Sequence, residues 1–131
     1  MKIPLNCREN GVTNSLKYLL DTNVILGVLK QNPEALRLID LQHTPLHACA
    51  YSFITRIELF SFPEINAAET KIIQDFLNEF TYLGMTPNVE DHTIEIRKQY
   101  RLKLPDAMIS ATARAYGLEL LSLDQTLIRK H

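Results

Sequence analysis

The sequence predicts an α/β fold, a single domain whose central parallel β-sheet is flanked by helices on both sides. Its 131 residues are 46% hydrophobic and 22% charged, as in a single globular domain with one core. Short apolar runs typical of strands alternate along the chain with longer stretches of helical periodicity. This alternation is characteristic of parallel sheets, in which a helix connects each strand to the next.

Residues 1–16 show no hydrophobic periodicity, so we expect a loosely ordered N-terminal extension followed by a folded domain over residues 17–131. The domain begins with the apolar run 17–20, which predicts a strand. Asp21 ends this strand, and the apolar residues that follow predict a helix through Leu29. The domain therefore opens with a strand, a tight turn and a helix.

A second helix and a second strand follow. Asn32 and Pro33 are a typical N-cap and first residue of a helix, which we expect to extend to about Leu41. The side chains spaced to bury one face of this helix are Leu36, Ile39 and Asp40. Residues 46–50 then predict a strand, so the chain returns to the sheet at this point.

Two further helices have clear start signals. Ser52 is a favourable N-cap for the helix SFITRIELF, which Pro63 ends. Asn66, with Glu69 three residues later, resembles a capping box and predicts the start of a long amphipathic helix. The apolar residues expected to share one face of that helix are Ile72, Ile73, Phe76, Leu77 and Phe80.

The remaining sequence continues the alternation. We expect a strand at 81–85, a helix at 89–100, a helix from Pro105 to Gly117, a strand at 118–123 and a terminal helix at 125–131. Proline favours the first turn of a helix because its φ is fixed and its position needs no amide donor. Glycine commonly ends a helix because it adopts the left-handed backbone without a steric cost.

Charge and cysteine content exclude several classes of protein. The 14 basic and 15 acidic residues give a net charge of -1, which excludes a uniformly basic nucleic-acid-coating protein and a highly charged disordered chain. Cys7 and Cys49 lack metal-ligand spacing, which excludes the usual zinc sites and favours a reducing compartment. No apolar run approaches the roughly 18 residues that span a bilayer, and the N-terminus is polar where a signal peptide is apolar. We expect a cytoplasmic protein without membrane contact.

Three aspartates occupy positions where functional groups occur in α/β proteins. Asp21 and Asp124 directly follow two predicted strands, and Asp106 lies in the first turn of the helix that Pro105 opens. Because the carboxyl ends of parallel strands share one edge of a sheet, functional side chains gather at that edge. Helix capping explains the same positions, because aspartate accepts hydrogen bonds from free amides at a helix start. Position alone leaves both interpretations open.

Glu58 lies inside a predicted helix, where capping does not apply. Its apolar neighbours along the helix are Ile54, Ile57, Leu59 and Phe62. A carboxylate in such surroundings is costly and indicates a function, whereas the alternative is an exposed glutamate on a polar stripe with Thr55 and Arg56. Four carboxylates at one sheet edge repel each other unless a divalent cation is bound. Oxygen ligands without cysteine or clustered histidine favour Mg²⁺ or Mn²⁺ over Zn²⁺.

Four sequence strings carry a family resemblance. In chain order they are YLLDTNVIL, ITRIELF, KLPDAMISATA and LLSLDQTL. Together they resemble the four acidic motifs of PIN-domain ribonucleases, and most closely those of the VapC-type toxins of bacterial toxin–antitoxin pairs. The resemblance extends from Lys17 to the C-terminus. It departs from the family after Asp124, where many members have a further aspartate in an Asp-Phe ending and this chain has Gln125, Thr126 and Leu127.

The resemblance implies a metal-dependent endoribonuclease with a central parallel sheet. The residues to which it assigns the catalytic and metal-binding roles are Asp21, Glu58, Asp106 and Asp124, with Thr22 as the hydroxyl that supports the site. It implies Mg²⁺ or Mn²⁺ as the cofactor and hydrolysis of single-stranded or loop RNA by a metal-activated water. It also implies a homodimer that a small VapB-like antitoxin protein inhibits.

A strip of basic residues precedes Asp106. Its members are Arg97, Lys98, Arg101 and Lys103, interleaved with Tyr100. A basic strip of this kind is suited to hold RNA phosphates against a negative site. The alternative is a solvated helix end, and the sequence supports both interpretations equally.

Other functions stay open. A housekeeping RNA-processing PIN nuclease without an antitoxin has the same motifs, and a non-catalytic PIN module is disfavoured because no acidic position is lost. A receiver-like signalling module would use Asp21 as its phosphoacceptor, but it needs a lysine after the last strand, where Asp124 stands. The cluster of Phe53, Phe60 and Phe62 is expected in the core, with a dimer or antitoxin surface as the alternative.

Overall fold

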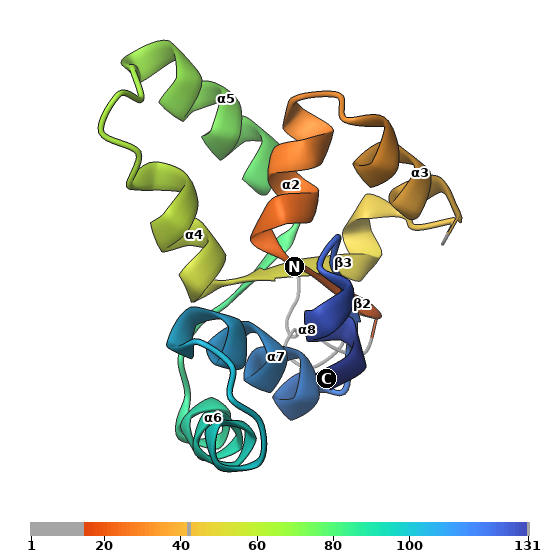
Figure 1. The fold of residues 1–131 in the computed structure, drawn as a ribbon. Coiled ribbons are helices and arrows are strands. Elements are labelled where there is room, and N and C mark those ends of the chain that lie inside the picture. The colour runs from red at the N-terminus through yellow and green to blue at the C-terminus, as the bar shows by residue number, and fades with distance from the viewer. Residues whose placement is uncertain (1–14, 42, 131) are drawn as a thin grey trace.

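The computed structural model describes residues 15–41 and 43–130, which form a four-stranded parallel sheet covered by helices (Figure 1). The strands are β2 (Tyr18–Leu20), β3 (Cys49–Ser52), β4 (Thr81–Leu83) and β5 (Glu119–Leu121). The helices are α2 (Thr22–Leu29), α3 (Pro33–Leu41), the short 3₁₀ helix η1 (Leu46–Ala48), α4 (Phe53–Phe60), α5 (Ala67–Leu77), α6 (Pro87–Gln99), α7 (Leu104–Tyr116) and α8 (Gln125–Lys130). The extension expected over the first residues lies, up to residue 14, outside the described residues.

The first described strand occupies the middle of the sheet. The strand order is β4-β3-β2-β5, and all three pairings are parallel. Leu19 of β2 lies opposite Ala50 of β3 on one side and Leu120 of β5 on the other. The carboxyl ends of these strands therefore point to the same edge of the sheet. The predicted α/β fold with a parallel sheet is confirmed.

Two hydrophobic cores cover the opposite faces of the sheet. Leu19 is buried with Ile96 of α6 and Ile109 of α7, whereas its neighbour Leu20 is buried with Ile25 of α2 and Leu59 of α4. Successive residues of a strand point to opposite faces, so this separation shows that helices cover both sides. Leu16, within the predicted extension, is already buried in the first of these cores.

Local signals at helix ends correctly predicted the elements they flank. The Ser52 side chain accepts a hydrogen bond from the amide of Thr55 at the start of α4 (3.4 Å). Asn66 and Glu69 form the expected capping box, with bonds of 2.8 and 3.1 Å. Gly117 ends α7 with a φ of 66°, in the left-handed region that glycine tolerates.

The buried face predicted for α3 is wrong in part. Leu36 is 44% exposed and Asp40 is exposed, whereas Ala35 is fully buried. The cause is the close approach of α2 and α3, because a Cβ added to Gly27 would lie 2.5 Å from the Cβ of Ala35. At this contact the two helices meet through their smallest side chains, and Leu36 lies on the exposed side of α3, whereas Ile39 packs against the core as predicted.

The second strand begins later than residues 46–50 predict. Residues 46–48 form the 3₁₀ helix after Pro45, whose carbonyl accepts a hydrogen bond from the Ala48 amide (3.0 Å). The strand starts at Cys49 and is buried throughout. Apolar residues alone did not distinguish a tight turn from a strand here.

Besides Leu36, two further hydrophobic residues expected in the interior lie on the surface. Phe53 and Phe60 pack against the cores, but Phe62 follows α4 and is 49% exposed. Ile72 of α5 is 59% exposed, although Leu77 on the same helix is buried as predicted. No helix within the described residues is long and apolar enough to cross a membrane.

Candidate active site

Asp21 stands at the carboxyl end of the central strand. It is the N-cap of α2, and its side chain is only 5% exposed. The carboxylate accepts hydrogen bonds from the amide of Thr22 (2.7 Å) and from the hydroxyl of Ser122 (2.7 Å). Ser122 directly follows β5, so the pairing of β2 with β5 brings the hydroxyl to the carboxylate.

The surroundings of Asp21 disfavour its charged form. Burial is the main cause and raises the pKa of the Asp21 carboxyl above its ordinary value. The hydrogen bonds from Ser122 and Thr22 lower this pKa, and the negative charges of Asp106 and Glu58 raise it. Three carboxylates from three different elements therefore influence one another across this edge of the sheet.

Glu58 is held by a chain of hydroxyl groups. The hydroxyl of Thr22 donates to Oε1 of Glu58 at 2.6 Å, and it also lies 2.9 Å from the hydroxyl of Thr55. Thr55 precedes Glu58 by three residues on α4, so both side chains lie on the face of the helix that meets α2. The contact between the two helices thus connects the first and second acidic motifs.

The apolar surroundings expected for Glu58 are absent. Glu58 is exposed, and its neighbour Ile57 is 57% exposed, because this face of α4 reaches the surface. The alternative interpretation predicts that Thr55 and Glu58 share an exposed polar stripe, but Thr55 is fully buried. The glutamate is accordingly a solvent-facing carboxylate anchored by a buried hydroxyl.

Asp106 lies in the first turn of α7, near enough to Asp124 and Glu58 for their negative charges to act on it. Burial raises the pKa of its carboxyl, and the charges of Asp124 and Glu58 raise it further, while Lys103 lowers it. The N-cap of α7 is Lys103, and no side chain caps this helix start. Capping therefore does not explain Asp106, and its position beside two other carboxylates is the more informative observation.

Asp124 caps the start of α8, as the capping interpretation of the sequence predicts. It is exposed, and its Oδ1 accepts hydrogen bonds from the amides of Thr126 (2.9 Å) and Leu127 (3.3 Å) at the start of α8. Its own amide donates to the hydroxyl of Ser122 (2.9 Å). The capping interpretation thus applies to Asp124 as well as to Asp21. In Asp124 only Oδ1 accepts the capping hydrogen bonds.

The donor groups at this edge suit a hard divalent cation. They are carboxylate and hydroxyl oxygens. The negative charges of the carboxylates repel one another, and a bound cation offsets this repulsion. Among the described residues, no group of three or more His, Cys, Asp or Glu side chains is placed so that it could hold a metal ion. Mg²⁺ commonly binds through one or two carboxylates and keeps waters and substrate phosphates as its other ligands. The residues therefore fit an ion that remains partly hydrated.

A family model described as a PIN domain matches residues 18–131. The chain belongs to the PIN-domain family. It is 35% identical to Ribonuclease VapC2 of Haemophilus influenzae, over 82% of this chain and 86% of that protein. The resemblance of the chain to PIN-domain proteins of the VapC type is confirmed.

Solved structures of similar proteins agree with the fold. A toxin–antitoxin complex from Klebsiella pneumoniae contains a chain with a TM-score of 0.71 and 28% identity, matched over 82% of this chain and 87% of that chain. FitAcB from Neisseria gonorrhoeae has a TM-score of 0.68 at 22% identity, over 86% and 91% of the two chains, and shows the shared fold. A receiver-like module is not supported by these similarities.

Three polar residues of this PIN domain were missed as parts of the site. Ser122 donates a hydrogen bond to Asp21, and Thr55 reaches Glu58 only through the hydroxyl of Thr22. Asn23 donates to the hydroxyl of Ser122 (3.4 Å) and accepts from the amide of Leu123 (3.1 Å), so it connects α2 to the end of β5. The available signal was position, because all of these residues lie at a strand end or within one turn of an acidic motif residue.

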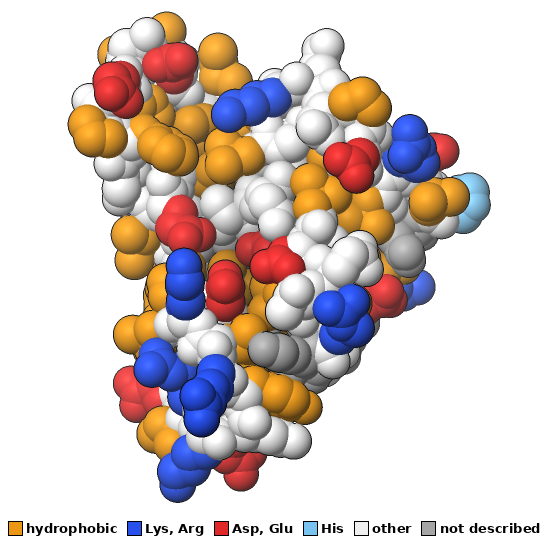
Figure 2. All heavy atoms as spheres, viewed as in Figure 1, with side chains coloured by type: hydrophobic (Ala, Val, Ile, Leu, Met, Phe, Trp, Pro, Cys, Tyr) orange, Lys and Arg blue, Asp and Glu red, His pale blue; other side chains and the backbone are white. Residues whose placement is uncertain are grey.

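The basic strip lies beside the acidic groups of the PIN domain. Arg97 and Lys98 form the last turn of α6, and Arg101 and Lys103 lie in the segment before α7. All four side chains are exposed, and none forms an ion pair with a carboxylate in the described part of the chain. Figure 2 shows lysine and arginine side chains gathered over α6 and the start of α7, next to acidic side chains at the centre of the same face.

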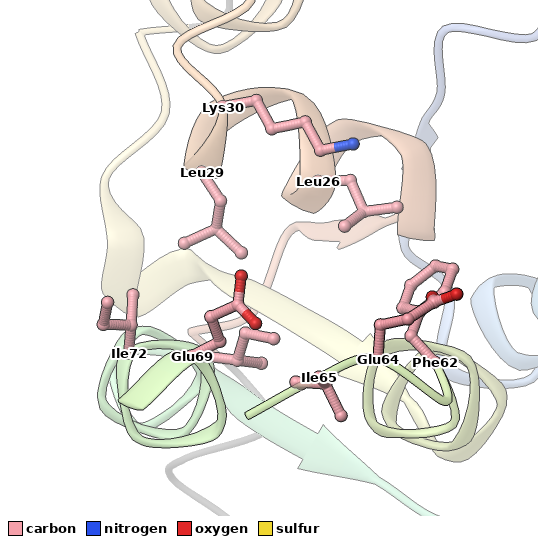
Figure 3. Close-up of a pocket in the computed structure, with 9 residues that line it drawn as sticks. Leu26, Leu29, Lys30, Phe62, Glu64, Ile65, Glu69 and Ile72 are labelled. Atoms are coloured by element: carbon pink, nitrogen blue, oxygen red, sulfur yellow. The ribbon is translucent and has the colours of Figure 1, made fainter. Parts of the chain in front are cut away.

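A second surface feature is a largely apolar groove (Figure 3). It lies between α2, α5 and the segment that joins α4 to α5. The residues that line it are Leu26, Leu29, Lys30, Phe62, Glu64, Ile65, Glu69, Ile72 and Ile73. Phe62 and Ile72, two of the exposed hydrophobic residues, both line it. The exposed side chains of Phe62 and Ile72 therefore belong to the same concave surface.

Proposed function

We propose that this PIN-domain protein is a metal-dependent endoribonuclease and the toxin of a VapBC-type toxin–antitoxin pair in the cytoplasm. The observation that carries the proposal is the meeting of acidic residues at one edge of the sheet: Asp21 ends β2, and the adjacent Thr22 hydroxyl binds Glu58 of α4. Asp106 of α7 is near enough for the charge of Glu58 to act on it. Two comparisons support it: the 35% identity to a Ribonuclease VapC2, and the similarity to a chain of a toxin–antitoxin complex.

The proposed cofactor is Mg²⁺ or Mn²⁺. Asp21, Glu58 and Asp106 would hold it, with Asp124 contributing through the oxygen that does not cap α8. When bound, such an ion lowers the pKa of a coordinated water and offsets the charge that develops on a phosphodiester during hydrolysis. Thr22 orients Glu58 by its hydrogen bond, and Ser122 does the same for Asp21.

The proposed substrate is single-stranded or loop RNA. The basic strip would hold its phosphates, because four exposed cations without carboxylate partners lie next to the acidic edge. Lys103 is the member closest in sequence to the carboxylates and acts on the pKa of Asp106. The strip would therefore guide the RNA backbone toward Asp106 while the carboxylates remain available to the ion.

The proposed partners are a VapB-like antitoxin and a second copy of the chain. The apolar groove supports the antitoxin, because Phe62 and Ile72 are exposed there in the free chain and their burial would stabilise a complex. An amphipathic segment with apolar side chains suits this groove. The homodimer follows from the family resemblance, and the molar mass of the free protein in solution tests it.

The deciding experiment combines cleavage in vitro with growth in cells. The purified protein is expected to cut single-stranded RNA with Mg²⁺ or Mn²⁺ and to stop doing so in EDTA. Asp106→Asn should abolish cleavage, because capping does not explain this aspartate and the amide is a poorer ligand. Expression without an antitoxin should arrest growth, and the Asp106→Asn variant should not.

Two outcomes would redirect the proposal. Cleavage that persists in EDTA and in Asp106→Asn would contradict the shared metal site. Metal-dependent cleavage without growth arrest, from a gene that has no small DNA-binding protein encoded beside it, would instead support a housekeeping RNA-processing nuclease.

A further inference from the structure

We infer that Thr55 is a positioning residue of the metal site, whose buried hydroxyl acts through Thr22 to hold the carboxylate of Glu58. The inference rests on the proposed function, because it assigns a role toward the same ion. The observation that carries it is a chain of two hydrogen bonds between α4 and α2. The Thr55 hydroxyl lies 2.9 Å from the Thr22 hydroxyl, which lies 2.6 Å from Oε1 of Glu58.

The direction of each hydrogen bond follows from the number of available protons. An ionised Glu58 only accepts, so the hydroxyl of Thr22 donates its single proton to Oε1 of Glu58. Thr22 has no proton left for Thr55, and at 2.9 Å the hydroxyl of Thr55 must therefore be the donor to Thr22. Each hydroxyl that donates and accepts polarises the next, which strengthens the bond to the carboxylate.

Burial separates the role of Thr55 from that of a ligand. Thr55 is fully buried, so its side chain meets neither the ion nor the RNA. Its backbone is fixed by the Ser52 cap at the start of α4. Glu58, in contrast, is exposed on the same helix, and a long exposed side chain samples several rotamers unless it is anchored. The anchor on Oε1 leaves Oε2 of Glu58 available to the ion.

The loss of the Thr55 hydroxyl is therefore expected to weaken ion binding without removing a ligand. Thr55→Val keeps the β-branched shape and deletes the donor, whereas Thr55→Ser keeps the donor. For one lost hydrogen bond we expect Thr55→Val to weaken Mn²⁺ binding about fivefold, and Thr55→Ser to restore it to within about twofold of the wild type.

The test is a titration of the metal-free protein with Mn²⁺, in which the electron paramagnetic resonance signal of free Mn²⁺ measures the affinity without RNA or cleavage. Thr93→Val is the matched control, because Thr93 is also buried and donates its hydroxyl proton to a backbone carbonyl of α6, away from the carboxylates. Thr93→Val should leave the affinity unchanged even if it lowers the melting temperature as much as Thr55→Val does.

A double-mutant cycle separates positioning from a general structural effect. If Thr55 acts through Glu58, Thr55→Val should cause no further loss of Mn²⁺ affinity in a protein that already carries Glu58→Gln. An equal loss in both backgrounds, or an unchanged affinity in Thr55→Val alone, overturns the inference. If Thr55→Val does not fold, Thr55→Ala takes its place in the same cycle.

The failure of this inference differs from the failure of the proposed function. Asp106→Asn included in the same titration should bind Mn²⁺ far more weakly than the wild type. If it binds equally well, the carboxylate site itself is refuted. If it loses Mn²⁺ while Thr55→Val does not, only the positioning role is refuted.

Discussion

The side chains of Asp21 and Ser122 are joined by a 2.7 Å hydrogen bond, although 101 positions separate them in the sequence. The bond exists because β2 and β5 are neighbours in the sheet and end side by side. A buried carboxylate at the proposed metal site thus depends on the pairing of the first and last described strands.

Removal of the Ser122 hydroxyl should lower both stability and cleavage. Ser122→Ala leaves a buried carboxylate with one hydrogen bond fewer, and we expect the free energy of unfolding to fall by about 1–3 kcal/mol. Urea unfolding measures this change. Ser61→Ala is the control, because Ser61 is exposed and bonds only to the carbonyl of Ile57. A loss no larger than that of the control would refute the role of Ser122.

Asp106→Asn should have opposite effects on stability without and with metal. In EDTA the melting temperature should rise, because the substitution removes repulsion from Asp124 and Glu58. In Mg²⁺ the order should reverse, since the wild type gains about 2.7 kcal/mol when the ion is at 100 times its dissociation constant and the variant gains much less. Equal gains in both proteins would show that Asp106 does not hold the ion.

Two substitutions of Asp124 should separate its two roles. Asparagine caps a helix about as well as aspartate, so Asp124→Asn should keep the stability of the metal-free protein, whereas Asp124→Ala should lower it by about 1 kcal/mol. If the free oxygen of Asp124 also holds the ion, both variants lose RNA cleavage. Normal cleavage by Asp124→Asn would assign Asp124 to capping alone.

The contribution of Asp21 and Asp106 to the stability of the metal-free protein should decrease as the pH rises above about 3.8, the ordinary carboxyl value, because the pKa of each is raised in the folded protein. The folded protein holds these protons to higher pH than the unfolded chain, so protonation favours folding and this contribution is lost on ionisation. Urea unfolding in EDTA at several pH values, compared with Asp106→Asn, measures the effect. The advantage of the variant should widen with pH, and a constant difference would contradict the coupling.

Loss of the basic strip should reduce RNA affinity and its dependence on salt. Arg97→Ala with Arg101→Ala removes two proposed phosphate contacts, so the slope of log affinity against log salt should become shallower. Filter binding to a catalytically inactive protein at several salt concentrations provides the measurement. Arg37→Ala with Lys71→Ala, on α3 and α5, is the control pair. An unchanged slope for the Arg97 and Arg101 variant would favour the alternative interpretation, in which the strip is a solvated helix end.

Features that depend on neighbouring residues could be predicted from the sequence. The capping box of Asn66 and Glu69 and the left-handed Gly117 follow from steric and hydrogen-bonding rules that act within a few residues. The parallel sheet could be predicted for a similar reason. Each strand or helix buries one side, so the spacing of its apolar residues reveals its type within the segment itself.

Features that depend on contacts between distant segments could not be predicted in this way. Helical periodicity marked Leu36 for burial, but the small contact between Gly27 and Ala35 decides which face of α3 is covered. Within the candidate site, the positions of the acidic residues were apparent, whereas the roles of Ser122 and Thr55 require knowledge of which elements touch.

The place of β5 in the sheet also sets an order of events during synthesis of the chain. A nascent polypeptide that ends before Glu119 already contains Asp21, Glu58 and Asp106, but β2 then lacks one of its two neighbours and Asp21 lacks the Ser122 hydroxyl. The arrangement around Asp21 can close only after β5 and Ser122 have been synthesised. A chain released from a stalled ribosome before Ser122 would therefore lack the assembled site, which limits formation of this site to chains that extend through β5 and Ser122.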